Sequence, residues 1–141
     1  MASLRSRDGE GKIVASRPSP RVLEIRSVGY ISRTGLERVL DDAELLMIGH
    51  PDIDTLLWNT LRHDGHEPGN PNLGMMFHRR HADRLHRAAM VTHSAPMAAL
   101  SNIARALFPG LAVGVFGKRE EAVAWLTRGH AQHGGKRTRV A

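Results

Sequence analysis

Cysteine is absent from the 141 residues of this sequence, which excludes both a disulfide framework and a zinc site built on thiolates. Long apolar runs are absent too, since no segment approaches the roughly 20 apolar residues that a membrane-spanning helix needs. Residues 1–7 lack the apolar stretch of a secretory signal. We therefore expect a soluble cytoplasmic protein with no membrane span, stabilised by one buried core.

Signatures of common catalytic sites are also missing. The sequence contains no Gly-x-Ser-x-Gly elbow, which presents a nucleophilic serine in many hydrolases. It also contains no His-Glu-x-x-His pair of the kind that holds a catalytic zinc ion. We therefore predict that the protein is not an enzyme, has no catalytic residues and uses no cofactor.

Histidine, by contrast, is abundant, with nine residues in the chain. His63 and His66 flank an expected turn, and His78 and His81 lie in a segment rich in arginine. Imidazole binds zinc and related metals, but these spacings match no established metal motif, and the adjacent arginines would repel a cation. We interpret the histidines as surface residues and predict no metal site.

The net charge of +6 is unevenly distributed along the chain. Residues 1–21 carry five basic and two acidic side chains, residues 129–141 carry three basic and none acidic, and residues 22–128 carry twelve of each. All of the positive excess therefore lies near the two ends. A dedicated nucleic-acid-binding domain more often carries its charge on one face of the folded body, so we expect no specific nucleic-acid binding.

Short apolar runs alternate with segments of helical periodicity through the middle of the chain, which is typical of βαβ units. The pattern predicts strands at residues 22–29, 54–61, 87–92 and 111–116. It predicts helices at residues 34–47, 72–85, 95–108 and 120–126. Thr34 and Glu37 fit a capping box for the first helix, and the Gly/Pro/Asn composition of residues 63–71 predicts a loop.

These elements define one domain over residues 21–128, flanked by segments of different composition. Residues 16–20 are rich in proline and serine, and residues 129–141 are rich in glycine and poor in apolar side chains. We predict a flexible basic tail at residues 1–20 and another at residues 129–141. Whether residues 12–15 add an edge strand to the sheet stays open at this point.

Four stretches carry a resemblance to a known family. They are Val22-Leu23-Glu24-Ile25 leading to Gly29, Arg87-Ala88-Ala89-Met90-Val91, Phe108-Pro109 before Val113-Gly114-Val115-Phe116, and Glu121-Ala122-Val123-Ala124-Trp125-Leu126. Together they resemble the SpoIIAA-like proteins, a bacterial group similar in fold to the STAS domains of anti-sigma-factor antagonists. The resemblance implies an α/β fold with a mixed sheet of four or five strands, antiparallel N-terminal strands, and about four helices packed mainly on one side.

The resemblance also implies a non-catalytic regulatory or protein-interaction module. Antagonists of anti-sigma factors carry a phosphorylatable serine at the start of the helix after the second central strand, where added charge breaks partner binding. The equivalent stretch here is Arg62-His63-Asp64-Gly65-His66-Glu67-Pro68-Gly69, which contains no serine or threonine. We therefore expect an unknown protein partner, or a second copy of the chain, bound without the usual phosphorylation switch.

The expected arrangement of parallel strands predicts one candidate site. The carboxyl ends of parallel strands meet at one edge of an open α/β sheet, where helix N-termini present free N–H groups. Thr92, His93 and Ser94 follow one predicted strand. Lys118 follows the next strand, and His63 follows an earlier one. These residues are candidates for binding a small anion or the head of an acidic ligand, although Ser94 equally fits a simple N-cap role.

The alternative to an interaction module is therefore a domain that binds a small acidic or apolar ligand or a lipid. Folds related to this one hold apolar ligands between the sheet and the helices. An apolar cavity of roughly several hundred Å³ there would favour ligand binding. A well-filled core with an exposed apolar patch would favour a protein partner.

Overall fold

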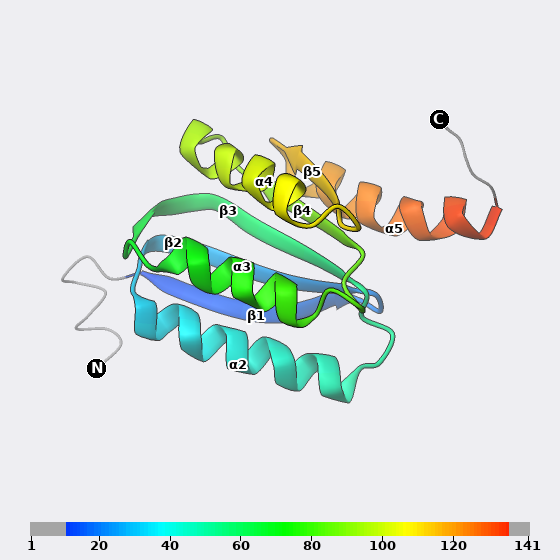
Figure 1. The fold of residues 1–141 in the computed structure, drawn as a ribbon, viewed down its shortest axis with the longest axis horizontal. Helices are drawn as coiled ribbons and strands as arrows, with labels where there is room; N and C mark the ends of the chain where they lie inside the picture. Colours follow the sequence, from blue (N-terminus) through cyan, green and yellow to red (C-terminus); the bar gives the residue numbers. More distant parts are fainter. Residues whose placement is uncertain (1–10, 136–141) are drawn as a thin grey trace.

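Five strands form one sheet in the order β1-β2-β3-β4-β5 in the computed structural model, which describes residues 11–135 (Figure 1). The strands are β1 (Lys12–Ser19), β2 (Val22–Ile31), β3 (Thr55–His66), β4 (Arg87–Val91) and β5 (Ala112–Phe116). The helices are α2 (Arg33–Gly49), α3 (Asn70–Arg80), α4 (Ala95–Leu107) and α5 (Arg119–Gly135). β1 runs antiparallel to β2, and the other neighbouring pairs are parallel. This mixed α/β sheet confirms the predicted fold class.

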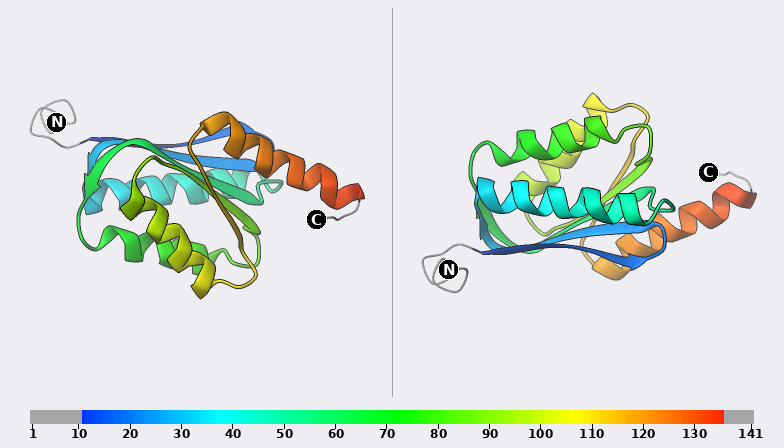
Figure 2. Two further views of the ribbon diagram at one scale, coloured as in Figure 1. Left: turned by 90° about the horizontal axis from the view of Figure 1, so that it is seen from above. Right: turned by 90° about the horizontal axis from the view of Figure 1, so that it is seen from below.

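The helices cover the two faces of the sheet unequally. α2, α3 and α4 lie on one face, and α5 lies on the other (Figures 1 and 2). Side chains alternate between the faces along a strand, so Leu23 and Ile25 pack toward α2, whereas Val22 packs toward α5. β2 is therefore a nearly continuous apolar run at its start, as expected of a strand buried on both faces. No helix in the described part of the chain is both long enough and apolar enough to cross a membrane.

β1 departs from the predicted domain boundaries. Residues 12–19, which the composition assigns to a flexible tail, pair with β2 instead. Ile13 and Ala15 pack against the core under α2. Pairing with a long neighbour compensates for a weak local strand signal, so the domain includes this edge strand. At the other end, α5 passes the predicted boundary at residue 128 and continues to Gly135. The remaining tail residues, 1–10 and 136–141, lie outside the described residues.

β3 runs farther than predicted, to His66 instead of residue 61. The composition of the following residues favours turns, but the far half of β2 offers partners, and Gly29 pairs with His63 and Ile31 with His66. The register shifts beside Gly29, whose φ of 80° is favourable for glycine. Pairing between distant segments has overridden the local turn signal, and it places both histidines on the sheet.

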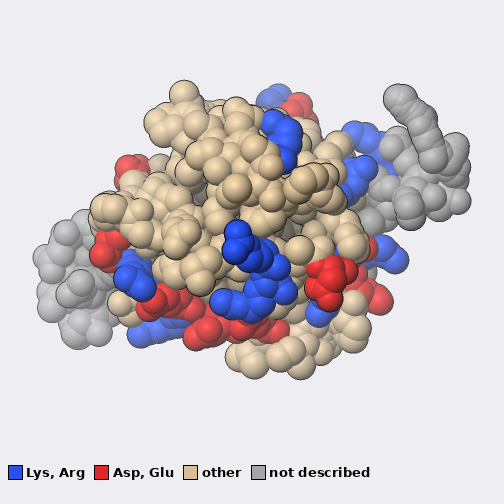
Figure 3. Space-filling model, viewed as in Figure 1, with Lys and Arg blue, Asp and Glu red and all other residues tan. Residues whose placement is uncertain are grey.

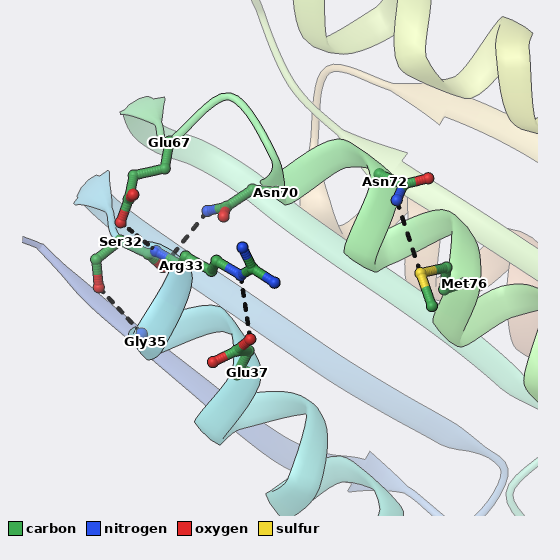
Figure 4. A network of polar contacts seen from close by, with 8 residues as sticks. All are labelled: Ser32, Arg33, Gly35, Glu37, Glu67, Asn70, Asn72 and Met76. Carbon is green, nitrogen blue, oxygen red and sulfur yellow. Dashed lines mark hydrogen bonds and ion pairs between the residues drawn. The ribbon is translucent and has the colours of Figure 1, made fainter.

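The first two helices begin at residues other than those predicted. Ser32, not Thr34, caps α2, because its hydroxyl accepts a hydrogen bond from Gly35 N at 3.0 Å (Figure 4). α3 begins at Asn70 instead of residue 72. The Asn70 side chain donates to the carbonyl oxygen of Ile31 at 3.0 Å. This contact ties the start of α3 to the end of β2.

β5 forms one edge of the sheet, and part of that edge is covered. The amide of Thr92 donates to the Phe116 carbonyl. The backbone carbonyls of successive residues in a strand point in opposite directions. Val113 lies three positions before Phe116, so its carbonyl faces away from β4. Arg105 Nη2 of α4 donates to this carbonyl at 2.9 Å. The outer side of β5 therefore carries a charged side chain.

One buried charge links α5 to the centre of the sheet. Glu24 of β2 is only 5% exposed, and its carboxylate accepts hydrogen bonds from Arg119 Nη2 at 2.7 Å and Asn59 Nδ2 at 3.1 Å. Burial opposes ionisation of Glu24, but these hydrogen bonds and the charge of Arg119 outweigh it, so the pKa of Glu24 lies below its ordinary value. The ion pair holds the start of α5 against β2 and β3.

Arg119→Gln should lower the free energy of unfolding by about 2 kcal/mol near neutral pH, because it leaves a buried carboxylate without its charged partner. The stability contributed by Glu24 is fully present above the pKa of the unfolded carboxyl and is lost as the pH falls through the lower folded pKa. Urea unfolding across this pH range measures both effects. Arg33→Gln, which breaks an exposed ion pair with Glu37, is the control and should cost less than about 1 kcal/mol. Equal losses in the two variants would contradict this role of Arg119.

Candidate functional site

A cavity of about 110 Å³ lies between the sheet and the helices α3 and α4. α3 packs mainly against α2, and its backbone makes few contacts with the strands. The residues that face the space include the small ones Gly74, Ala88 and Ala104, beside Met75 and Met97. The cavity thus results from a helix held away from the sheet and from small residues around the gap.

Three polar side chains at the β2–β3 side of the cavity form a hydrogen-bonded chain. Ser27 Oγ lies 2.9 Å from His63 Nδ1, and His63 Nε2 lies 2.8 Å from His66 Nδ1. All three residues line the cavity. Burial lowers the pKa of both imidazoles, and the proximity of His66 lowers that of His63 further, although Asp64 opposes the shift. Both rings are therefore neutral near physiological pH.

A second polar pair lines the same cavity from β3 and α3. Trp58 Nε1 donates to His78 Nε2 at 3.0 Å, while His78 Nδ1 has no hydrogen-bond partner. His78 is only 7% exposed, and burial, together with the nearby His81, lowers its pKa to about 4. The interpretation of the histidines as surface residues is wrong here, since His78 belongs to the buried stripe of α3 that contains Phe77.

The predicted strand-end residues lie outside this cavity, with the exception of His63. β4 and β5 pair in parallel, so Thr92 and Lys118 follow strand ends that meet at one edge. His93 Nε2 lies 2.9 Å from the Gly117 carbonyl oxygen, and Lys118 is exposed next to it. The structure therefore brings the other candidates to one edge and places His63 elsewhere.

Ser94 acts as the N-cap of α4, as the simpler interpretation expects. Its hydroxyl accepts a hydrogen bond from Met97 N at 3.3 Å, and its own amide donates to Thr92 Oγ1 at 3.0 Å. Pro96 in the first turn contributes no N–H. The Ala95 amide is therefore the donor that this helix start leaves for an anion.

Sequence reasoning missed Ser27, Trp58 and His78 as site residues. His78 follows Gly74 by four positions and Asn70 by eight, a spacing that places it on the same face of a helix and was available in the sequence. No comparable local signal links Ser27 to His63, because 36 positions separate them and only the β2–β3 pairing brings them together.

Similarity to known proteins agrees with this architecture. A family model described as SpoIIAA-like matches residues 22–127. The chain belongs to the SpoIIAA-like family. No protein with a curated description matches the sequence at a significant level. In the described part of this SpoIIAA-like chain, no three His, Cys, Asp or Glu side chains lie close enough together to hold a metal ion.

Solved structures share the fold of this SpoIIAA-like chain at low sequence identity. An uncharacterized protein with a SpoIIAA-like fold from Shewanella loihica PV-4 aligns with a TM-score of 0.65 and 18% identity, over 84% of this chain and 94% of that chain. The anti-sigma factor antagonist SpoIIAA in its unphosphorylated form gives a TM-score of 0.57 and 17% identity, over 82% and 97%. The Bacillus cell fate determinant SpoIIAA in the phosphorylated form gives 0.60 and 16%, over 81% and 98%.

His78 should titrate far below the ordinary histidine range. Because its pKa is lowered to about 4, the unfolded chain takes up the proton first as the pH falls. The stability contributed by neutral His78 is fully present above the unfolded histidine pKa of about 6.5 and is progressively lost below it. Ring ¹⁵N titration by NMR and unfolding across this range measure both effects. His78→Gln should remove part of the acid-induced loss of stability, because it removes the buried titratable ring. An ordinary titration of His78 would contradict its burial.

The strand-end anion site stays a prediction. Added phosphate should shift the amide resonances of residues 94–97, with the largest change at Ala95, because its N–H has no partner in the helix. Lys118→Ala should weaken the response by removing a nearby cation. Lys12→Ala, which changes an exposed lysine of β1, should leave it unchanged. If the amides do not move, Ser94 is a cap and nothing more.

Proposed function

We propose that this SpoIIAA-like domain is a non-catalytic regulatory module that binds a small apolar ligand between the sheet and the helices α3 and α4. The cavity is the observation that carries the proposal, because it combines apolar walls with a small number of polar groups, the usual composition of a ligand site. Lowered pKa values keep His63, His66 and His78 uncharged near neutral pH. The lining therefore suits an uncharged ligand.

The volume of the cavity limits the size of the ligand. At about 110 Å³, it is well below the roughly 300 Å³ at which drug-sized sites begin. It is closer to an engineered cavity of about 150 Å³ that binds benzene. We therefore favour a molecule near the size of one small ring over a lipid. Met75 and Met97 line the space, and their flexible side chains permit modest adaptation.

The polar chain at the cavity supports a binding role over a hydrolytic one. Ser27 and His63 are of the types that serve as nucleophile and base, but hydrolases of this kind orient the base with a further group, usually a carboxylate. No Asp or Glu side chain of the described residues lines the cavity. His66 occupies the third position instead, so Ser27 has no carboxylate-supported base.

The regulatory part of the proposal rests on where α3 lies. Residues 61–91, which include the end of β3 and all of α3, contain no serine, threonine or tyrosine. A hydroxyl-linked phosphoryl group cannot be added to this stretch. Because α3 borders the cavity, a bound ligand contacts the helix that follows the second central strand. Ligand binding is thus a physical replacement for the phosphorylation switch.

A second candidate function is binding of a protein partner through the outer face of α4. Arg105 is the only charged residue of this helix. Ile103 and Leu107, one turn apart, are 49% and 53% exposed, and Figure 3 shows a mostly uncharged surface over α4. Exposed apolar surface of this kind is typical of interaction sites. The two candidates are compatible, since the inner face of α4 lines the cavity.

Ala104→Leu should abolish ligand binding, because Ala104 is buried and lines the cavity that the longer side chain would fill. Benzene is the probe, and shifts of the amide resonances around the cavity measure its binding to the full chain. Ala106→Leu, at an exposed position of the same helix, should bind benzene like the parent. The larger side chain of Ala104→Leu should lower the free energy of unfolding by at most about 3 kcal/mol, because it overpacks the core. Benzene shifts that persist in Ala104→Leu, or that map to the outer face of α4, would contradict the proposal.

A further inference from the structure

The hydrogen bond between Trp58 and His78 fixes the position of a proton. The indole N–H of tryptophan is a donor and never an acceptor. His78 Nε2, which lies 3.0 Å from Trp58 Nε1, must therefore be the unprotonated nitrogen of a neutral ring. The ring proton is then on Nδ1.

This Nδ1–H has no partner within the protein. His78 is 7% exposed and lines the cavity, and its Nδ1 is buried without a hydrogen bond. Buried N–H groups in folded proteins are nearly always paired, because an unpaired one loses its water without compensation. The structure thus holds a buried N–H without an acceptor, on a side chain that lines an apolar cavity.

The charge of the lining restricts what can supply that acceptor. No Lys, Arg, Asp or Glu side chain among the described residues lines the cavity. A carboxylate or a phosphate in this space would lose part of its water and find no opposite charge beside it, which is unfavourable. A pure hydrocarbon would fill the space but leave the N–H unpaired.

We infer that the ligand of this cavity is a small, uncharged, mostly apolar molecule with an oxygen acceptor, a carbonyl or ether oxygen, that accepts a hydrogen bond from His78 Nδ1–H. This inference rests on the proposed function, because it names the class of ligand for the same cavity. It assigns separate roles to the two partners. Trp58 is a positioning residue that sets the tautomer, and His78 is the group that contacts the ligand.

The experiment compares two probes of nearly the same shape, cyclopentanone and methylenecyclopentane, in which an oxygen replaces a CH₂ group. Both are titrated into the full chain, and amide shifts give the two affinities. The hydration of the ketone weakens its binding to any apolar site, so the informative quantity is the ratio of the two affinities compared between variants. In the parent protein, the ketone should also move the ring ¹⁵N resonance of His78 Nδ1, and the hydrocarbon should not.

The decisive variant combines Trp58→Phe with His78→Phe, because His78→Phe alone would leave the indole N–H free to replace the lost donor. Relative to the parent, the double variant should lower the ketone-to-hydrocarbon affinity ratio by about tenfold, or about 1.4 kcal/mol. His78→Gln is the matched control. Its amide accepts from Trp58 and donates to the ketone, so the ratio should stay within about threefold of the parent.

Failure of this inference differs from failure of the proposed function. If neither probe binds the parent protein, the cavity is not a ligand site and the proposed function is wrong. If the hydrocarbon binds but the affinity ratio is the same in all three proteins, the ligand-class inference is overturned and the proposed function stands. If the double variant does not fold, the test is the ring ¹⁵N resonance of His78 Nδ1 in the parent protein. Equal shifts of this resonance with the ketone and the hydrocarbon overturn the inference.

Discussion

The parallel pairing of β2 with β3 is the contact on which the rest of the molecule depends. It joins strands of 10 and 12 residues and supplies backbone partners to β3 as far as His66. The same pairing puts Glu24 beside Asn59 on one face and Ser27 beside His63 on the other. The attachment of α5 and one wall of the cavity are therefore two results of a single strand register.

The two faces of the sheet deal with buried polar groups in opposite ways. On the α5 face, a carboxylate stays charged because Arg119 and Asn59 satisfy it. On the face with the cavity, His78 stays neutral because no group compensates a buried positive charge, and losing a proton is less costly than burying the charge. The first solution produces a fixed attachment. The second leaves hydrogen-bonding groups that a ligand can use.

Much of the fold was predictable from the sequence, because its signals are local. Strands buried on both faces are apolar runs, and helices such as α4 carry their own cap, Ser94, at the expected position. β1 and the far half of β3 were not predictable, because their residues become strands only through pairing with β2. The place of one candidate site residue was not predictable for the same reason. His63 was named for a strand end, yet the extended β3 places it in a cavity that no local pattern describes.

The position of Arg105 has a consequence for how this domain can meet another copy of itself. An open edge strand is a template to which a strand of a second molecule adds, and natural sheets discourage this with charged side chains at the edge. On β5, the guanidinium of Arg105 already holds the Val113 carbonyl, so an incoming strand would have to displace a charged donor from the bond it needs. Continuation of the sheet across two molecules is thereby opposed at this edge.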